Sequence, residues 1–71
     1  MSRYAVVIEH ADGNLSAYVP DLPGCVATGA TIDEVTTNLA ETIALHVQSL
    51  RDHGEPVPPP SSTTRMVDVA V

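Results

Sequence analysis

The sequence predicts an α+β domain in which a small sheet carries a single helix on one face. Three observations lead to this prediction. Short β-branched or alternating segments, separated by Gly and Pro turns, fill the first part of the chain. One amphipathic helical pattern follows them, and an alternating valine segment comes last. The expected element order is therefore strand, strand, strand, helix, strand, or βββαβ.

The first predicted strand is Arg3–Glu9, which is rich in β-branched and aromatic residues. Tyr4, Val6 and Ile8 would share one face. Both faces are apolar over most of their length, so we expect this strand to lie in the middle of the sheet. The following Asp-Gly pair supplies the positive φ that a short hairpin needs, and Leu15–Val19 is the predicted return strand.

The connection between the second and third strands is the segment VPDLPGC, residues 19–25. Its two prolines lack amide donors and must end the second strand. Pro23 and Gly24 suit the two central positions of a type II turn, and a third strand is expected to follow up to Gly29. Because no histidine or basic residue lies close in sequence, we expect Cys25 to pack as a small apolar side chain and not to act as a reactive thiol.

The helix begins at Thr31 and Glu34, whose spacing matches a capping box. A single apolar stripe at three- and four-residue steps follows; its members are Ile32, Val35, Leu39, Ile43, Val47 and Leu50. Gly54, with a proline two residues later, is expected to end the helix.

A Pro/Ser-rich connector, residues 57–64, leads to the last predicted strand, Arg65–Val71. Because the helix returns the chain, this strand should run parallel to the first and lie beside it, which gives the sheet order 3-2-1-4. We therefore expect one domain over residues 1–71, built on a four-stranded mixed sheet. One helix covers only one face of such a sheet, so the other face and two edges stay open.

Length and charge restrict the kind of protein this is. A chain of 71 residues hides only about 60% of its unfolded surface, and a single cysteine cannot form an internal disulfide, so we expect the chain to form an oligomer. Three basic and nine acidic residues give a formal net charge of −6. This field repels nucleic acid and attracts basic partners.

No pattern of catalysis or cofactor binding is present. Seven residues of helix place His46 and His53 about 10.5 Å apart, too far for one zinc ion, and Cys25 has no identifiable base. We therefore predict no catalytic residue, no metal, no cofactor and no enzymatic activity. No basic cluster, no second helix for a helix-turn-helix motif and no membrane-spanning run are present, so we expect a cytoplasmic protein without a separate DNA-binding domain and without direct nucleic-acid binding.

The candidate residues for binding a partner come from charge and exposure. Glu9, Asp12 and Asp21 are acidic residues at loop ends, and Tyr18 is an amphipathic side chain on the face opposite to Ala17 and Val19. Leu45 falls on the polar side of the helix and is a further candidate. For each residue taken singly, a solvated or packed structural role remains the alternative.

The sequence also resembles a known family. An apolar first strand, an Asp/Gly hairpin, a PDLPGC connector, a T-x-[ED]-E helix start and a GEPxP exit occur here in order, over residues 4–60. This combination is similar to the N-terminal domain of the HicB family of bacterial type II antitoxins. The resemblance implies a partial RNase H-like domain without the active carboxylates of the nuclease, usually found as dimers or tetramers. It also implies that the partner is a HicA-like toxin, a small basic protein that cleaves mRNA.

The resemblance and the charge together lead to the hypothesis that this chain binds and covers such a toxin. Two alternatives stay open. One is an orphan, self-associating domain that binds another protein or a small ligand. The other is a nuclease remnant that retains metal-dependent hydrolysis at Glu9 or Asp21.

Overall fold

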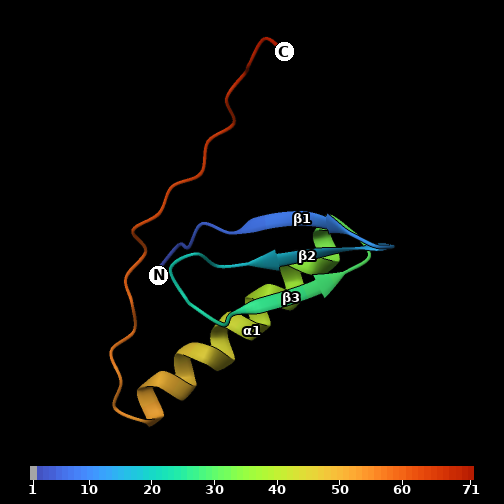
Figure 1. The fold of residues 1–71 in the computed structure, drawn as a ribbon. Helices are drawn as coiled ribbons and strands as arrows, with labels where there is room; N and C mark the ends of the chain where they lie inside the picture. The colour runs from blue at the N-terminus through green and yellow to red at the C-terminus, as the bar shows by residue number, and fades with distance from the viewer. Residues whose placement is uncertain (1) are drawn as a thin grey trace.

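The computed structural model describes residues 2–71 (Figure 1). Three antiparallel strands form one sheet: β1 (Val7–Ala11), β2 (Asn14–Tyr18) and β3 (Val26–Gly29). One helix follows, α1 (Ile32–Asp52). The sheet order is β1-β2-β3, so the α+β class and the order of the first three strands and the helix are confirmed.

The predicted fourth strand is absent from the described residues. Arg65–Val71 is extended but pairs with no strand, and β1 is therefore an edge strand and not a central one. The sheet order 3-2-1-4 was wrong in this respect. The alternation of the valines predicts an extended backbone, but a strand also needs a neighbour. In this structure the chain is held at the corner of the sheet by Ser61 and Ser62 and then leads away from β1 (Figure 1).

The β1–β2 hairpin closes on Asp12 and Gly13. Ala11 lies opposite Asn14, and Gly13 has a φ of 77°, a conformation that favours glycine. The pairing therefore continues to the turn itself, and β1 lies nearer to the turn than the predicted span Arg3–Glu9.

The β2–β3 connection inserts a side chain into the core. Leu22 is fully buried between the two prolines, and its carbonyl accepts a hydrogen bond of 3.1 Å from the Cys25 amide across Pro23 and Gly24. Gly24 has a φ of 84°, as the predicted type II turn requires. Cys25 is also buried, and burial raises the pKa of its thiol, so it packs in the core as predicted.

The predicted capping box begins the helix. The Thr31 hydroxyl accepts a hydrogen bond from the Glu34 amide at 3.1 Å, and the Glu34 carboxylate accepts one from the Ala30 amide at 3.2 Å. At the other end, Gly54 has a φ of 69°, and the Glu55 amide donates to the Leu50 carbonyl at 2.8 Å. The helix therefore ends at the predicted glycine.

The core lies between α1 and one face of the sheet. Its seven buried residues come mainly from β2, the β2–β3 connection and the first half of the helix; they are Leu15, Ala17, Val19, Leu22, Cys25, Val35 and Leu39. The helix packs against β3 and β2. With 21 residues it is about 31 Å long, whereas a five-residue strand spans about 17 Å, so its C-terminal half runs beyond the sheet (Figure 1).

Substitution of Leu22 by Ala tests the role of the β2–β3 connection. Because Leu22 is fully buried, L22A is expected to lower the free energy of unfolding by about 2–5 kcal/mol, measured by urea denaturation. The matched control is L45A, since Leu45 is 73% exposed and its truncation should change stability by no more than about 0.5 kcal/mol. Equal effects of the two substitutions would contradict this assignment of the core.

Candidate partner-binding surface

One face of the sheet is covered by no helix or strand of residues 2–71. Leu15, Ala17 and Val19 point toward the helix, and side chains alternate along a strand, so Ser16 and Tyr18 point to the other side. The register extends this assignment to the neighbouring strands. We call the resulting surface the open face; it consists of Val7 and Glu9 from β1, Ser16 and Tyr18 from β2, and Val26 and Thr28 from β3.

The open face has an apolar row and a polar row. Val7 lies opposite Tyr18, and Tyr18 lies opposite Val26, so one aromatic and two β-branched side chains cross all three strands. Tyr18 is 40% and Val26 is 59% exposed. The next row places Glu9 opposite Ser16 and Ser16 opposite Thr28. Adjacent strands lie about 4.8 Å apart, so each row is a continuous strip of neighbouring side chains.

Acidic groups lie at the polar end of the open face. Glu9 belongs to the polar row, and the exposed Asp12 follows it at the β1–β2 turn. The only basic side chains of the chain other than histidine are Arg3, Arg51 and Arg65, and none of them lies on a strand of the sheet. The open face is therefore apolar in one row and acidic at one end.

The structure brings together only some of the predicted contact residues. Glu9 and Tyr18 share the open face, and Asp12 lies at its border. Leu45 is exposed on α1, away from the sheet, and Asp21 lies in the β2–β3 connection, beyond the opposite end of β2. Sequence reasoning missed Val7 and Val26; the two-residue period of their strands was the signal that could have placed them beside Tyr18.

Asp21 has a structural partner within the chain. Its carboxylate accepts hydrogen bonds from the amides of Ser61 and Ser62, both at 2.9 Å, and from their hydroxyls at 3.1 and 2.8 Å. The bonds to Ser62 and Ser61 lower the pKa of Asp21 from 3.8 to about 2 because they favour the ionised form. Asp21 therefore anchors the C-terminal segment to the corner of the sheet.

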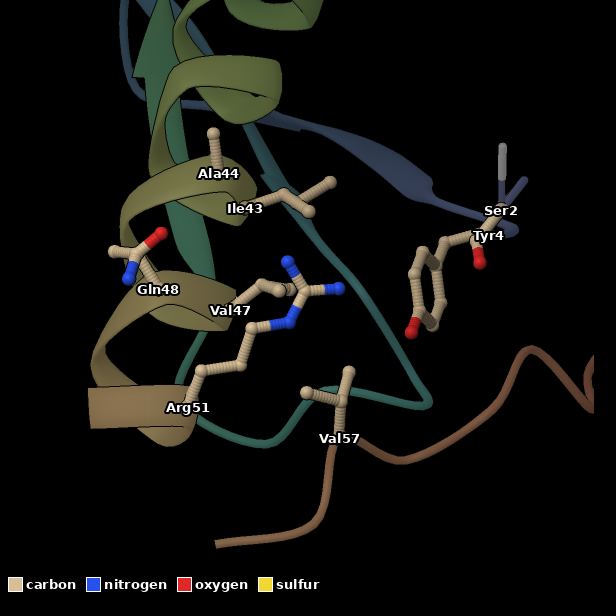
Figure 2. A pocket seen from close by; sticks show the side chains of 8 residues that line it. All are labelled: Ser2, Tyr4, Ile43, Ala44, Val47, Gln48, Arg51 and Val57. Atoms are coloured by element: carbon tan, nitrogen blue, oxygen red, sulfur yellow. The ribbon is translucent and has the colours of Figure 1, made fainter. Parts of the chain in front are cut away.

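A second contact anchors the same segment. The Tyr4 hydroxyl donates a hydrogen bond of 2.6 Å to the Pro58 carbonyl. Tyr4 and Val57 line a pocket of about 480 Å³ together with residues of α1. Figure 2 shows them facing Ile43, Val47 and Arg51 across this pocket. This pocket lies where the helix runs beyond the sheet, and its walls are largely apolar.

No group of three or more His, Cys, Asp or Glu side chains within residues 2–71 could hold a metal ion. In the same part of the chain, no helix has the length and hydropathy that crossing a bilayer requires.

An open sheet face with an aromatic centre and an acidic border is a surface of the kind that binds another protein. Comparison with known sequences identifies the family to which this chain belongs. The sequence profile described as "HicB_like antitoxin of bacterial toxin-antitoxin system" matches residues 4–70. The chain belongs to this family of HicB-like antitoxins, as its sequence motifs predicted.

The chain is also similar to two curated proteins and to a solved structure. The chain is 39% identical over 57 residues to UPF0150 protein Ta0767 of the archaeon Thermoplasma acidophilum, which covers 79% of this chain and 83% of that protein. It is 33% identical over 55 residues to an uncharacterized 14.9 kDa protein of Haemophilus phage HP1. This alignment covers 78% of this chain but only 41% of the phage protein. A chain of the HicA3 and HicB3 toxin-antitoxin complex has the same fold, with a TM-score of 0.73 and 32% identity over 83% of this chain and 70% of that chain.

The pKa of Asp21 predicts how the C-terminal anchor depends on pH. Because the pKa falls from 3.8 to about 2 on folding, the anchor should be fully formed above pH 3.8 and lost as the pH falls through about 2. NMR titration of the Ser61 and Ser62 amide protons should show a midpoint near pH 2, and D21N should abolish this titration. A midpoint near 3.8 would show that the carboxylate is not held by the two serines.

Proposed function

We propose that this chain is the antitoxin of a toxin-antitoxin pair and that it binds and covers a small, basic, HicA-like toxin that cleaves mRNA. The observation that carries the proposal is membership of the HicB-like antitoxin family, supported by the likeness to a chain of a HicA3 and HicB3 complex. The fold offers this chain an uncovered sheet face for such a partner.

The open face has the composition of a protein interface. Its centre is Tyr18, flanked by Val7 and Val26 on the neighbouring strands. An aromatic residue with aliphatic neighbours provides a large contact area at a low cost in conformational entropy, whereas Ser16 and Thr28 supply hydrogen-bonding groups at its side. We therefore assign the toxin contact to the open face, with Tyr18 as its anchor.

Electrostatics supports a basic partner. The formal net charge is −6, and Glu9 and Asp12 place two of the acidic groups on or beside the open face. Opposite charge accelerates the encounter with a basic toxin and disfavours other acidic proteins. It also repels RNA, so a bound antitoxin replaces the substrate at a basic surface without binding RNA itself.

The proposed action is occlusion and contains no bond-making step. The antitoxin inhibits at a fixed stoichiometry by covering the surface through which the toxin contacts RNA. We place it in the cytoplasm as a homodimer or homotetramer with a partial RNase H-like fold, acting as one domain over residues 1–71 without catalytic groups or cofactors.

Co-expression with the product of the adjacent gene tests the proposal. The two proteins should co-purify, and the antitoxin should restore growth that the toxin alone arrests. If the purified cognate toxin keeps full RNA-cleaving activity at saturating amounts of this chain, occlusion is wrong. An orphan role would then be favoured, most clearly if no small basic protein is encoded beside this gene.

Two matched substitutions test the assignment to the open face. Val26 and Leu45 are both exposed apolar residues, 59% and 73% respectively, on opposite sides of the molecule. V26K and L45K change the net charge equally, so their long-range effect on a basic partner is the same. V26K is expected to weaken toxin binding at least tenfold, about 1.4 kcal/mol, measured by calorimetry, whereas L45K should change it much less. The reverse order would place the toxin on the helix.

Charge reversal at Asp12 tests the proposal that acidic residues at the open face attract the basic toxin. D12K should slow toxin association and flatten its dependence on ionic strength, because the acidic border of the open face steers the encounter. Stopped-flow rates at several salt concentrations give both quantities. As a control of equal charge, D52K alters the C-terminal end of α1 and should affect the rate less. Equal rates for D12K and the unmodified chain at low salt would remove Asp12 from the encounter surface.

A further inference from the structure

The apolar stripe of α1 continues beyond the part of the helix that the sheet covers. Val35 and Leu39 belong to the buried core, whereas Ile43 and Val47, at the next steps of the stripe, are only half-buried. The C-terminal half of the helix overhangs the sheet (Figure 1). Packing against the sheet therefore accounts for Val35 and Leu39, but only in part for Ile43 and Val47.

The chain that follows the helix turns this overhang into a pocket. At Gly54, whose φ is 69°, the chain reverses its direction, and the next segment, residues 55–62, crosses in front of the overhang. We call this segment the strap. It is held by the 2.6 Å hydrogen bond from the Tyr4 hydroxyl to the Pro58 carbonyl and, at its far end, by the carboxylate of Asp21. Four of its residues are prolines, which fix φ, so the pocket has a stiff outer wall.

The pocket combines apolar walls with a single charged side chain. Its volume is about 480 Å³, within the range of about 300–1,000 Å³ that is usual for small-molecule sites. Val57 of the strap and the ring of Tyr4 form one wall. Ile43, Val47 and Arg51 follow one another at four-residue spacing and so share one face of α1, which faces that wall (Figure 2). Arg51 is the only charged residue of the lining.

Arg51 gives the pocket a charge opposite to that of the chain. With three basic and nine acidic residues the formal net charge is −6, so the field of the whole chain repels anions. Asp52 is the neighbour of Arg51 in sequence, but it does not line the pocket, and its carboxylate accepts a hydrogen bond of 2.8 Å from the Gln48 side chain. A guanidinium stays protonated and binds a carboxylate through two parallel hydrogen bonds. The pocket is therefore suited to one negative charge.

We propose that this pocket binds a free monocarboxylic acid of medium chain length, with the carboxylate on Arg51 and the hydrocarbon chain between α1 and the strap. The hydrocarbon covers Ile43 and Val47, and this apolar burial supplies the affinity, while the arginine fixes the orientation and excludes cations. One cation matches one carboxylate, whereas a phosphate monoester brings additional negative charge without a second cation to receive it.

The pocket and the open face are separate surfaces. Tyr4, Ile43 and Val57 lie on the helix side of the sheet, whereas Tyr18 and Val26 lie on the opposite side and do not line the pocket. The carboxylic acid is therefore expected to bind whether or not a toxin is present. Failure of this proposal leaves the proposed toxin contact untouched, and the reverse also holds.

NMR titration of the full chain with two matched probes tests the proposal. Octanoate should bind one to one with a dissociation constant below about 1 mM and should shift the methyl signals of Ile43, Val47 and Val57, while those of Val26 stay unchanged. Octylammonium has the same hydrocarbon chain and the opposite charge, and should bind at least about tenfold more weakly. The absence of saturable octanoate binding, equal binding of the two probes, or shifts confined to the open face would overturn the proposal.

Substitution of Arg51 tests the residue that the proposal assigns to the carboxylate. R51M removes the charge but keeps an apolar stem, and should weaken octanoate binding at least about tenfold. R65M removes an equal charge outside the pocket and should leave the affinity within about twofold, because a distant exposed charge is screened. Unchanged affinity in R51M would also overturn the proposal.

Arg51 has a second role that the experiment must separate from binding. It lies in the last turn of α1, where a cation stabilises the helix. Circular dichroism of R51M shows whether the helix has shortened, and R51K, which keeps the cation, should recover part of the octanoate affinity. The comparison of octanoate with octylammonium uses the unmodified chain, so its outcome does not depend on how R51M folds.

Discussion

A single helix covers one face of a sheet that carries apolar side chains on both faces, and the position of the helix decides which of them remain exposed. The helix approaches the sheet closely at Gly29, where a Cβ atom would lie 2.6 Å from the Val35 amide nitrogen and 2.9 Å from its Cα. Only glycine allows the helix to approach the backbone of β3 this closely. Because α1 lies over β3 and β2, it leaves β1 half-covered and the opposite face bare. The proposed toxin contact follows from this position.

The two exposed surfaces have different chemistry and need not compete. The open face offers side chains, with Tyr18 at the centre and Glu9 at the acidic end, and it suits a folded basic protein. The β1 edge offers backbone hydrogen-bonding groups, and it suits an extended segment. A small domain whose core has only seven buried hydrophobic residues among those the structure describes gains stability when either surface is covered, since the additional apolar burial comes from a partner and not from its own core.

Local chemistry in the sequence was sufficient to predict most of the fold. The capping box at Thr31, the positive φ at Gly24 and the end of the helix at Gly54 each depend on a few neighbouring residues, and the structure confirms all three. The alternation along β2 also placed Tyr18 on the face opposite to Ala17, as the register shows. These features could be predicted because each of them depends on residues only a few positions apart in the sequence.

The features that sequence reasoning missed depend on contacts between distant residues. From its neighbours in sequence, Asp21 is expected to be a solvated loop residue. In the structure its carboxylate accepts hydrogen bonds from Ser61 and Ser62, which lie about forty residues later in the chain. Leu22 has no periodic neighbours, so nothing in the local pattern predicts its burial. The valines of 65–71 predict an extended backbone, but whether that strand pairs depends on which edge it can reach.

The central claim is that the bare face of the sheet, and not the outer face of the helix, is the side that another protein covers. Solvent relaxation enhancement by a neutral paramagnetic chelate measures this directly, in the chain alone and in its complex with the basic toxin. The account predicts that the enhancement at Tyr18 and Val26 falls on complex formation while that at Leu45 is unchanged. Continued exposure of Tyr18 and Val26 in the complex, with protection of Leu45, would contradict it.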